Sequence, residues 1–244
     1  MKKFKNFSLL LVLFVLSSVL YGCPGGGGSS TLIDEMIEAY GGEEKLKLLD
    51  SYSVLWNMNA IAKSDTGKDV RHVKQPDKLR VELFYDSGNV ELRILDGDQG
   101  ISGIQGQGQQ KAAPMQVNAM KIQRARLYTP LVLKSKAEGV TLSEEDGVKV
   151  LSIKEGDLVT KYYVNAQTKL IEKSVGILSM GGQSMEFITE YSDYREVKSA
   201  STPGVAGPIF AHKEVKYAMG MNTAVNTLMD IKFNEPHPDG RFSM

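Results

Sequence analysis

Apolar and polar residues alternate with a period of two through residues 51–96, the pattern of β-strands with one buried face. Val54, Trp56, Met58 and Ala60 are separated by single residues that include two asparagines, and the same alternation returns around Leu83. Turn residues separate the alternating runs, and Asp96-Gly97 is the strongest short hairpin signal in the chain. The pattern therefore predicts a meander of antiparallel strands in the first half.

The second half repeats this pattern after two helical segments. Apolar residues recur at helical spacing over residues 31–40, where Ser30 or Thr31 is the expected cap, and Pro114 begins a second helix that extends to about residue 128. Residues 99–113 are rich in Gly and Gln and are expected to form a mobile connection, and residues 234–244 a surface tail. Further strands are predicted at residues 140–142, 148–153, 158–164, 170–178, 185–197, 209–218 and 227–233.

These elements predict one domain over residues 31–244. About ten to twelve short strands with two inserted helices indicate a mostly β fold with some α-helix, in which one antiparallel sheet is strongly curved or nearly closed. Such a sheet buries its concave face against side chains, helices or a ligand. The concave face is therefore where we look for function.

Several short motifs, taken together, resemble the LolA/LolB-like superfamily, which includes the outer-membrane lipoprotein-sorting group. They are Ala39-Tyr40-Gly41-Gly42, Gln75-Pro76-Asp77-Lys78-Leu79-Arg80, Leu95-Asp96-Gly97, Tyr163-Val164-Asn165 with Thr168-Lys169-Leu170, Tyr191-Ser192-Asp193-Tyr194-Arg195-Glu196-Val197 and Ile231-Lys232-Phe233-Asn234. The resemblance implies an unclosed, half β-barrel covered by a few helices, whose cavity holds acyl chains of a lipid or lipoprotein. It names no cargo.

Ten side chains on the expected strands are candidates for the wall of such a cavity. They are Trp56, Met58, Val81, Leu83, Leu92, Ile94, Tyr162, Val164, Met185 and Phe187. Alternation predicts a filled core equally well, so the pattern alone leaves both readings open. The resemblance favours the cavity, and eleven methionines favour it slightly, because flexible thioether side chains adapt to variable apolar ligands.

The N-terminus predicts export and lipid anchoring. Three lysines in the first five residues precede an apolar run over residues 9–16, and Gly22-Cys23 follows. This arrangement resembles a bacterial lipobox, although Tyr21 departs from it. We expect a signal peptide over residues 1–22, a lipidated Cys23, and a flexible Gly/Ser tether over residues 23–30. The alternative is an incidental thiol after an ordinary signal peptide.

Composition excludes several other classes of function. The chain carries 29 basic and 29 acidic residues and has no basic run to hold nucleic acid or anionic headgroups. His72, His212 and His237 lack metal-ligand spacing, so no metal site is predicted. The glycines after Asp96 are followed by a polar, Gln-rich stretch among antiparallel strands, and not by the helix that a phosphate loop opens. No catalytic motif and no cofactor motif is present, and we expect a protein that is not an enzyme.

The function hypothesis is a non-catalytic envelope lipoprotein. It would bind acyl chains of a lipid or lipoprotein in an apolar cavity, for transport or localisation, and would face the periplasm, with the outer membrane favoured because Pro24 stands where the inner-membrane retention signal has Asp. Its partners would be the membrane, through the anchor, and an acylated cargo. A structural or assembly lipoprotein with a filled core is the alternative hypothesis.

Overall fold

The computed structural model describes residues 27–104, 108–180, 182–198 and 204–243. Its strands form one sheet in the order β6-β5-β4-β3-β2-β1-β13-β12-β11-β10-β9-β8-β7, and every neighbouring pair is antiparallel. Two meanders, β1 to β6 and β7 to β13, are thus joined through the pairing of β1 with β13. The outer strands β6 and β7 do not pair with each other, so the barrel is open. This confirms the predicted curved, unclosed sheet.

The strand boundaries are as follows. In the first meander they are β1 (Ser51–Ala60), β2 (Asp65–Lys74), β3 (Lys78–Tyr85), β4 (Val90–Asp96), β5 (Gln99–Ile104) and β6 (Gly108–Lys111). In the second they are β7 (Val140–Glu145), β8 (Val148–Glu155), β9 (Leu158–Val164), β10 (Ile171–Met180), β11 (Gln183–Lys198), β12 (Ala206–Ala218) and β13 (Met221–Phe233). Residues 99–104 and 108–111 therefore form strands that extend the sheet edge, where the sequence predicted a mobile connection over residues 99–113.

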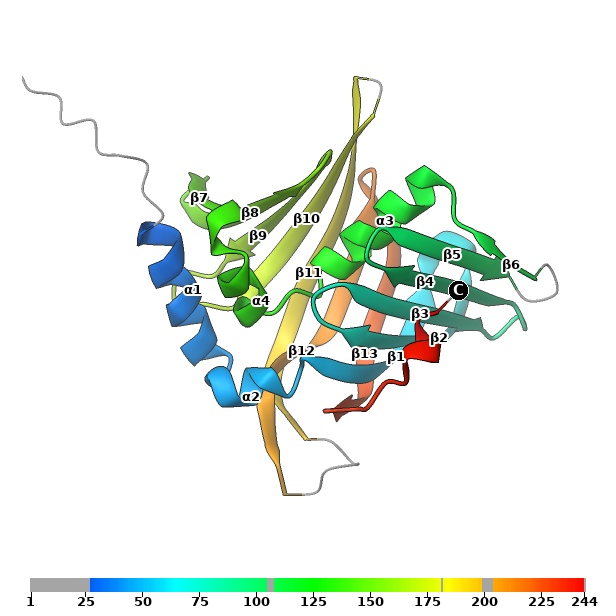
Figure 1. Cartoon of the computed structure of the whole chain (residues 1–244), viewed down its shortest axis with the longest axis horizontal. Coiled ribbons are helices and arrows are strands. Elements are labelled where there is room, and N and C mark those ends of the chain that lie inside the picture. Colours follow the sequence, from blue (N-terminus) through cyan, green and yellow to red (C-terminus); the bar gives the residue numbers. More distant parts are fainter. Residues whose placement is uncertain (1–26, 105–107, 181, 199–203, 244) are drawn as a thin grey trace, which may run out of the picture.

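Within the described residues, four α-helices cover the concave side, namely α1 (Gly27–Ala39), α2 (Glu43–Lys47), α3 (Pro114–Ala125) and α4 (Pro130–Ser135). Figure 1 shows α1 and α2 at one end of the sheet and α3 crossing in front of it, between β10 and β5. The part of the chain that the structure describes also has three short 3-10 turns: η1 (Ile61–Lys63), η2 (Ala137–Gly139) and η3 (Asp239–Arg241). None of the described helices is both long and apolar enough to cross a membrane.

Helix α1 buries one face against the sheet and α4. Leu32, Ile33 and Met36 are at most 2% exposed, as their helical spacing requires. The helix ends where Gly41 and Gly42 take positive φ values of 105° and 92°, conformations that glycine adopts without strain. The helix begins within the predicted tether, so Ser30 and Thr31 lie inside it, and neither is the cap that the sequence suggested. The tether residues 23–26 and Cys23 lie outside the described residues.

The main core lies between the concave face and these helices. Tyr52, Val54, Trp56 and Leu79 from the first meander meet Tyr162 and others from the second in one continuous apolar cluster. A second, smaller cluster lies on the opposite face of the sheet, where the C-terminal tail places Phe242 against Ile94 and Ile101. The tail crosses the convex face, as predicted for residues 234–244.

Candidate functional site

A cavity of about 500 Å³ lies between the concave face of the sheet and α3. Its apolar wall includes Met58, Val81 and Leu83 from the first meander and Phe187 from β11, and Met120 of α3 faces them. The volume falls within the range of ordinary small-ligand sites. The concave face is therefore not completely filled at this position.

Helix α3 roofs the cavity because its sequence and its neighbours both favour a close approach. Pro114 stands at the first helical turn, and the Gln116 side chain accepts a hydrogen bond of 2.9 Å from the Ala113 amide. Two glycines on the strands beneath, Gly100 and Gly176, leave room for the side chains of α3. A Cβ at Gly176 would lie 2.2 Å from Cγ2 of Ile122, and one at Gly100 would lie 3.2 Å from Sδ of Met120. The helix contacts β3, β4 and β5 on one side and β9 and β10 on the other. It thus bridges the two meanders.

The floor of the cavity is charged. Arg71 of β2 donates to Asp69 through Nη2 at 2.7 Å and to Glu214 of β12 through Nη1 at 3.0 Å and Nη2 at 2.7 Å. Lys216 lies 3.0 Å from the same Asp69 oxygen, and Asn226 donates to it at 2.8 Å. Asp69, Arg71 and Glu214 are 1%, 6% and 4% exposed. Two carboxylates and two cations therefore form a nearly dry, mutually neutral network.

Each charge in this network depends on the others. Burial by itself raises the pKa of a carboxyl group, but the positive charges of Arg71 and then Lys216 outweigh it, and the pKa of Asp69 is held well below its usual range. The same two cations lower the pKa of Glu214. Burial and the neighbouring Arg71 lower the pKa of Lys216. The carboxylates are therefore ionised and paired at neutral pH, as buried charges must be.

Trp56 lies under this network. The Arg71 guanidinium carbon is 5.2 Å from the centre of the indole ring, within the range of a cation–π contact. The indole is fully buried and is not part of the cavity surface, although the sequence analysis proposed it as a wall residue.

The structure brings only part of the proposed wall together. Met58, Val81, Leu83 and Phe187 surround the cavity. Tyr162 and Val164 lie in the main core, where the Tyr162 hydroxyl donates to the Ala125 carbonyl at 2.7 Å. Met185 packs beside Phe187 against a small cluster under α3, formed by Ile122, Leu158 and Leu178. The role of these residues in lipid binding stays a prediction.

Leu92 and Ile94 lie on the face opposite to the cavity. In the β3–β4 register Val81 pairs with Arg93, and Leu83 pairs with Glu91, so the charged positions of β4 continue the concave face. Leu92 and Ile94 point to the convex side and pack with Ile101 beneath Phe242 of the tail. The sequence prediction put Leu92 and Ile94 on the concave face because alternation alone does not show that a sheet has apolar contacts on both of its faces.

The charged floor is the feature that the sequence analysis missed. Asp69 and Arg71 alternate at period two with Gly67 and Val73 on the buried face of β2. Because β2 pairs with the strongly apolar β1, its inward positions had to be buried, and charges there required partners. The sequence holds this signal, but not the identity of the partner on β12.

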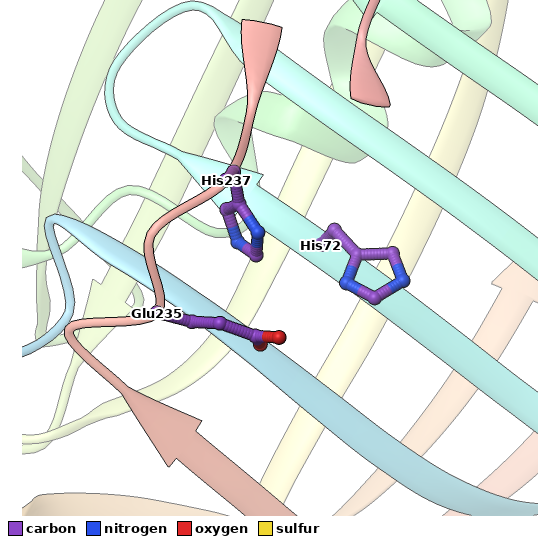
Figure 2. Close-up of side chains that lie close together, drawn as sticks. All are labelled: His72, Glu235 and His237. Carbon is purple, nitrogen blue, oxygen red and sulfur yellow. The ribbon is translucent and has the colours of Figure 1, made fainter. Parts of the chain in front are cut away.

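A second cluster of titratable groups lies on the convex face, at the tail. Figure 2 shows His72 with Glu235 and His237, and one ligand-type atom from each lies within 4.8 Å of the others. The spacing of the histidines in the sequence gave no sign of this cluster, yet the His72 and His237 rings lie 5.5 Å apart between their centres. Chain separation hides the contact because the tail returns across β2.

Arg241 supplies the positive charge for this cluster. Its Nη1 lies 3.0 Å from Nδ1 of His72, 3.4 Å from Nδ1 of His237 and 3.5 Å from Oε1 of Glu235. Nε2 of His237 approaches the Tyr52 carbonyl at 3.1 Å, so the ring fits there as a donor and turns Nδ1 toward the guanidinium as an acceptor. The group thus fastens the tail, and the guanidinium takes the position between the three acceptors.

Comparison with known proteins identifies the fold. No family model and no curated protein matches the sequence. Solved structures with a similar fold are, however, found. A LolA-superfamily protein from Nitrosomonas europaea is similar with a TM-score of 0.55 and 12% identity, over 88% of this chain and 97% of that one. A putative outer-membrane lipoprotein-sorting domain from Vibrio parahaemolyticus is similar with a TM-score of 0.52 and 10% identity, over 89% of this chain and 97% of that one. The chain has a LolA-like fold.

Proposed function

We propose that this protein is a non-catalytic envelope lipoprotein that binds acyl chains in the concave cavity. The observation that carries the proposal is the cavity of about 500 Å³, walled by Met58, Val81 and Leu83 and roofed by a helix. Apolar side chains that face a cavity rather than each other gain stabilisation when a hydrocarbon replaces water there. The LolA-like fold supports the same role, because one similar structure is described as a lipoprotein-sorting domain.

Helix α3 is the element that would admit the chain. It closes the cavity from one side and contacts strands of both meanders. Its buried face is small, with Met120, Ile122 and Ala125 as the apolar residues that are nearly inaccessible. A helix held by so few apolar contacts opens locally at low cost, which binding and release of a long chain require.

Lipid binding by matched variants of neighbouring residues tests the proposal. Leu83 lines the cavity and is 8% exposed, whereas Phe84, the next residue of β3, points to the other face and is 39% exposed. Leu83→Glu is expected to abolish binding of a fluorescent fatty acid, and Phe84→Glu to leave it unchanged. Phe187→Glu, at a partly exposed wall position, is the second cavity variant if Leu83→Glu does not fold.

Two outcomes of this binding measurement would count against the proposal. Equal binding by the native chain and both folded cavity variants would place the lipid elsewhere and contradict the proposal. No binding by the native chain, after delipidation and incubation with fatty acid and acylated peptide, would favour an assembly protein that acts through its surface.

The proposal includes the membrane anchor and the location. A lipid on Cys23 would hold the domain at the bacterial envelope, and the outer membrane facing the periplasm is the location we favour. The cargo would then be an acylated lipoprotein or a lipid that reaches the cavity while the protein stays attached to its membrane.

A further inference from the structure

We propose that the ligand of the cavity is an anionic amphiphile, a single acyl chain with a carboxylate or phosphate head group, and that Arg126 binds this head group. The inference rests on the proposed function and specifies the class of ligand. It follows from three observations: the unpaired charge of Arg126, the excess of cations around the cavity, and the position of Arg126 between two hollow regions.

Arg126 is the only arginine of the cavity wall that makes no ion pair with a carboxylate in the described part of the chain. It follows the last residue of α3, and its side chain turns inward. Nη1 donates to Oγ1 of Thr189 at 2.8 Å and Nε donates to the Ile122 carbonyl at 3.4 Å. A guanidinium has five N–H donors, so three are left for a ligand.

The cavity wall carries more positive than negative charge, although the whole chain is neutral. The basic residues of the wall are Lys63, Arg71, Arg93, Arg126 and Lys216, and the acidic ones are Asp69 and Glu214. Glu91 pairs with Lys63 and, at 2.9 Å, with Arg93. These pairs leave an excess of two positive charges. An anionic ligand would neutralise part of it, whereas a neutral lipid would not.

The charges on the floor do not compete with Arg126 for this role. The carboxylates of Asp69 and Glu214 are already held by Arg71 and Lys216. Their network is neutral and nearly inaccessible, so adding an anion there would unbalance it. Arg126 contacts neutral acceptors instead, and a carboxylate or phosphate bound to its free donors would form charge-assisted hydrogen bonds, the stronger kind.

Arg126 also stands where two hollow regions meet. The main cavity and a smaller pocket of about 70 Å³ share Arg126, Leu127, Tyr191 and Glu214 as wall residues. The smaller pocket is lined mainly by apolar and aromatic side chains, among them Tyr40, Leu49 and Phe210. With the head group on Arg126, the acyl chain would lie along Val81 and Leu83 in the main cavity. The guanidinium thus sets the orientation of the ligand, with the head group at Arg126 and the acyl chain in the main cavity.

A pair of ligands that differ only in head group tests the inference. The full chain is purified in a nonionic detergent, and native mass spectrometry follows the binding of hexadecanoate, hexadecanol and a monoacyl glycerol phosphate. Both anions are expected to bind about tenfold or more tightly than the alcohol, the effect of one hydrogen bond to a charged group. The two anionic probes distinguish a carboxylate from a phosphate head group.

Arg126→Gln is expected to reduce the ratio of the affinities for the anions and for hexadecanol to near one, while binding of hexadecanol persists. Lys121→Gln is the matched control, because it removes a positive charge from α3 itself, five residues before Arg126 and outside the cavity wall, where Lys121 pairs with Asp98. Its preference for anions is expected to equal that of the native chain. Arg126→Lys, which keeps the charge, is expected to retain part of the preference.

The outcomes separate the two proposals. Equal affinity for acid and alcohol, or a preference that survives in Arg126→Gln, would overturn the inference and leave the lipid-binding function intact. Failure of every probe to bind a folded native chain would overturn both. If Arg126→Gln does not fold, the lipids that co-purify with the native chain decide. Enrichment of anionic lipids over the membrane average supports the inference, and a neutral set contradicts it.

Discussion

Arg71 and Glu214 face each other in a two-pronged ion pair, although 143 residues separate them in the sequence. Strands β1 and β13 lie between their own strands, β2 and β12. On a flat sheet β2 and β12 would be about 14 Å apart, three times the usual strand spacing. The curvature of the sheet and the length of both side chains close this gap. The pair is thus a direct consequence of the open-barrel shape.

Removing Arg71 is expected to destabilise the protein strongly. In Arg71→Met the buried carboxylates of Asp69 and Glu214 lose their main partner, and breaking such a pair costs about 3–5 kcal/mol of unfolding free energy. Chemical denaturation measures the loss. The quadruple variant Arg71→Met, Asp69→Asn, Glu214→Gln, Lys216→Met removes all four charges of the network, including Lys216, which would otherwise lose both carboxylates. It is expected to recover most of the stability, and a quadruple variant no more stable than Arg71→Met would contradict this account.

Stability is expected to fall as the pH drops from about 6.5 to about 4. Burial, then the charge of Arg241, lowers the pKa of His72 to about 4. In the unfolded chain the same imidazole has a pKa near 6.5. Within this window the unfolded state binds a proton that the folded state does not, so acid favours unfolding. Because the ring is partly exposed, we expect the free energy of unfolding to fall by about 1–2 kcal/mol, which is less than the full pKa shift would give.

Histidine NMR titration separates the contribution of the tail from that of burial. In Arg241→Gln a neighbouring cation is lost, and the pKa of His72 is expected to rise toward 6.5. Arg195→Gln removes an exposed arginine from another part of the sheet and serves as the control, with no change at His72 expected. An unchanged His72 pKa in Arg241→Gln would show that burial alone sets it.

The fit of α3 on the sheet is expected to depend on Gly176. A methyl group there would overlap Cγ2 of Ile122, which is fully buried, and overpacking of this kind costs about 1–3 kcal/mol. Gly176→Ala is therefore expected to lower stability and to increase hydrogen exchange in residues 114–125. Gly139→Ala is the control, because its added methyl group meets no atom within 4 Å.

A double variant checks that the overlap itself is the cause. Ile122→Ala removes the obstructing methyl group but leaves a gap under α3, which Gly176→Ala partly fills. The combined loss of stability is expected to be smaller than the sum of the two single losses by about 0.5–3 kcal/mol. Additive losses would show that the two sites do not share a contact.

Lipid attachment at Cys23 is expected to decide where the protein is found. Cys23 is the single cysteine of the chain, so labelled palmitate has one thiol-linked position to report. The native chain is expected to incorporate the label and to fractionate with membranes, and Cys23→Ser to lose the label. Ser30→Ala, which keeps the cysteine, controls for changes near the N-terminus. Label retained in Cys23→Ser would contradict lipidation at this residue.

Local pattern was sufficient for the elements and the fold class. Residues 158–164 were predicted as a strand with the boundaries that β9 has, and the helix from Pro114 ends within three residues of the expected position. Period-two alternation and turn residues act over a few positions, so they are visible in the sequence. The glycine-rich residues 99–104 were misassigned because the hairpin with β4 overrides their weak strand propensity.

What the sequence by itself determined is the series of strands and helices and the unclosed sheet that they build. It named Met58, Val81, Leu83 and Phe187 as candidates, but it did not decide between a cavity and a filled core. Only the tertiary structure decided that Arg71 meets Glu214, that Arg126 reaches the cavity with no carboxylate partner among the described residues, and that His72 meets His237 of the tail. The reason is physical. Alternation states that a side chain is buried, but the register and curvature of distant strands determine which charge lies beside it, and a buried charge is stable only where its partner is present.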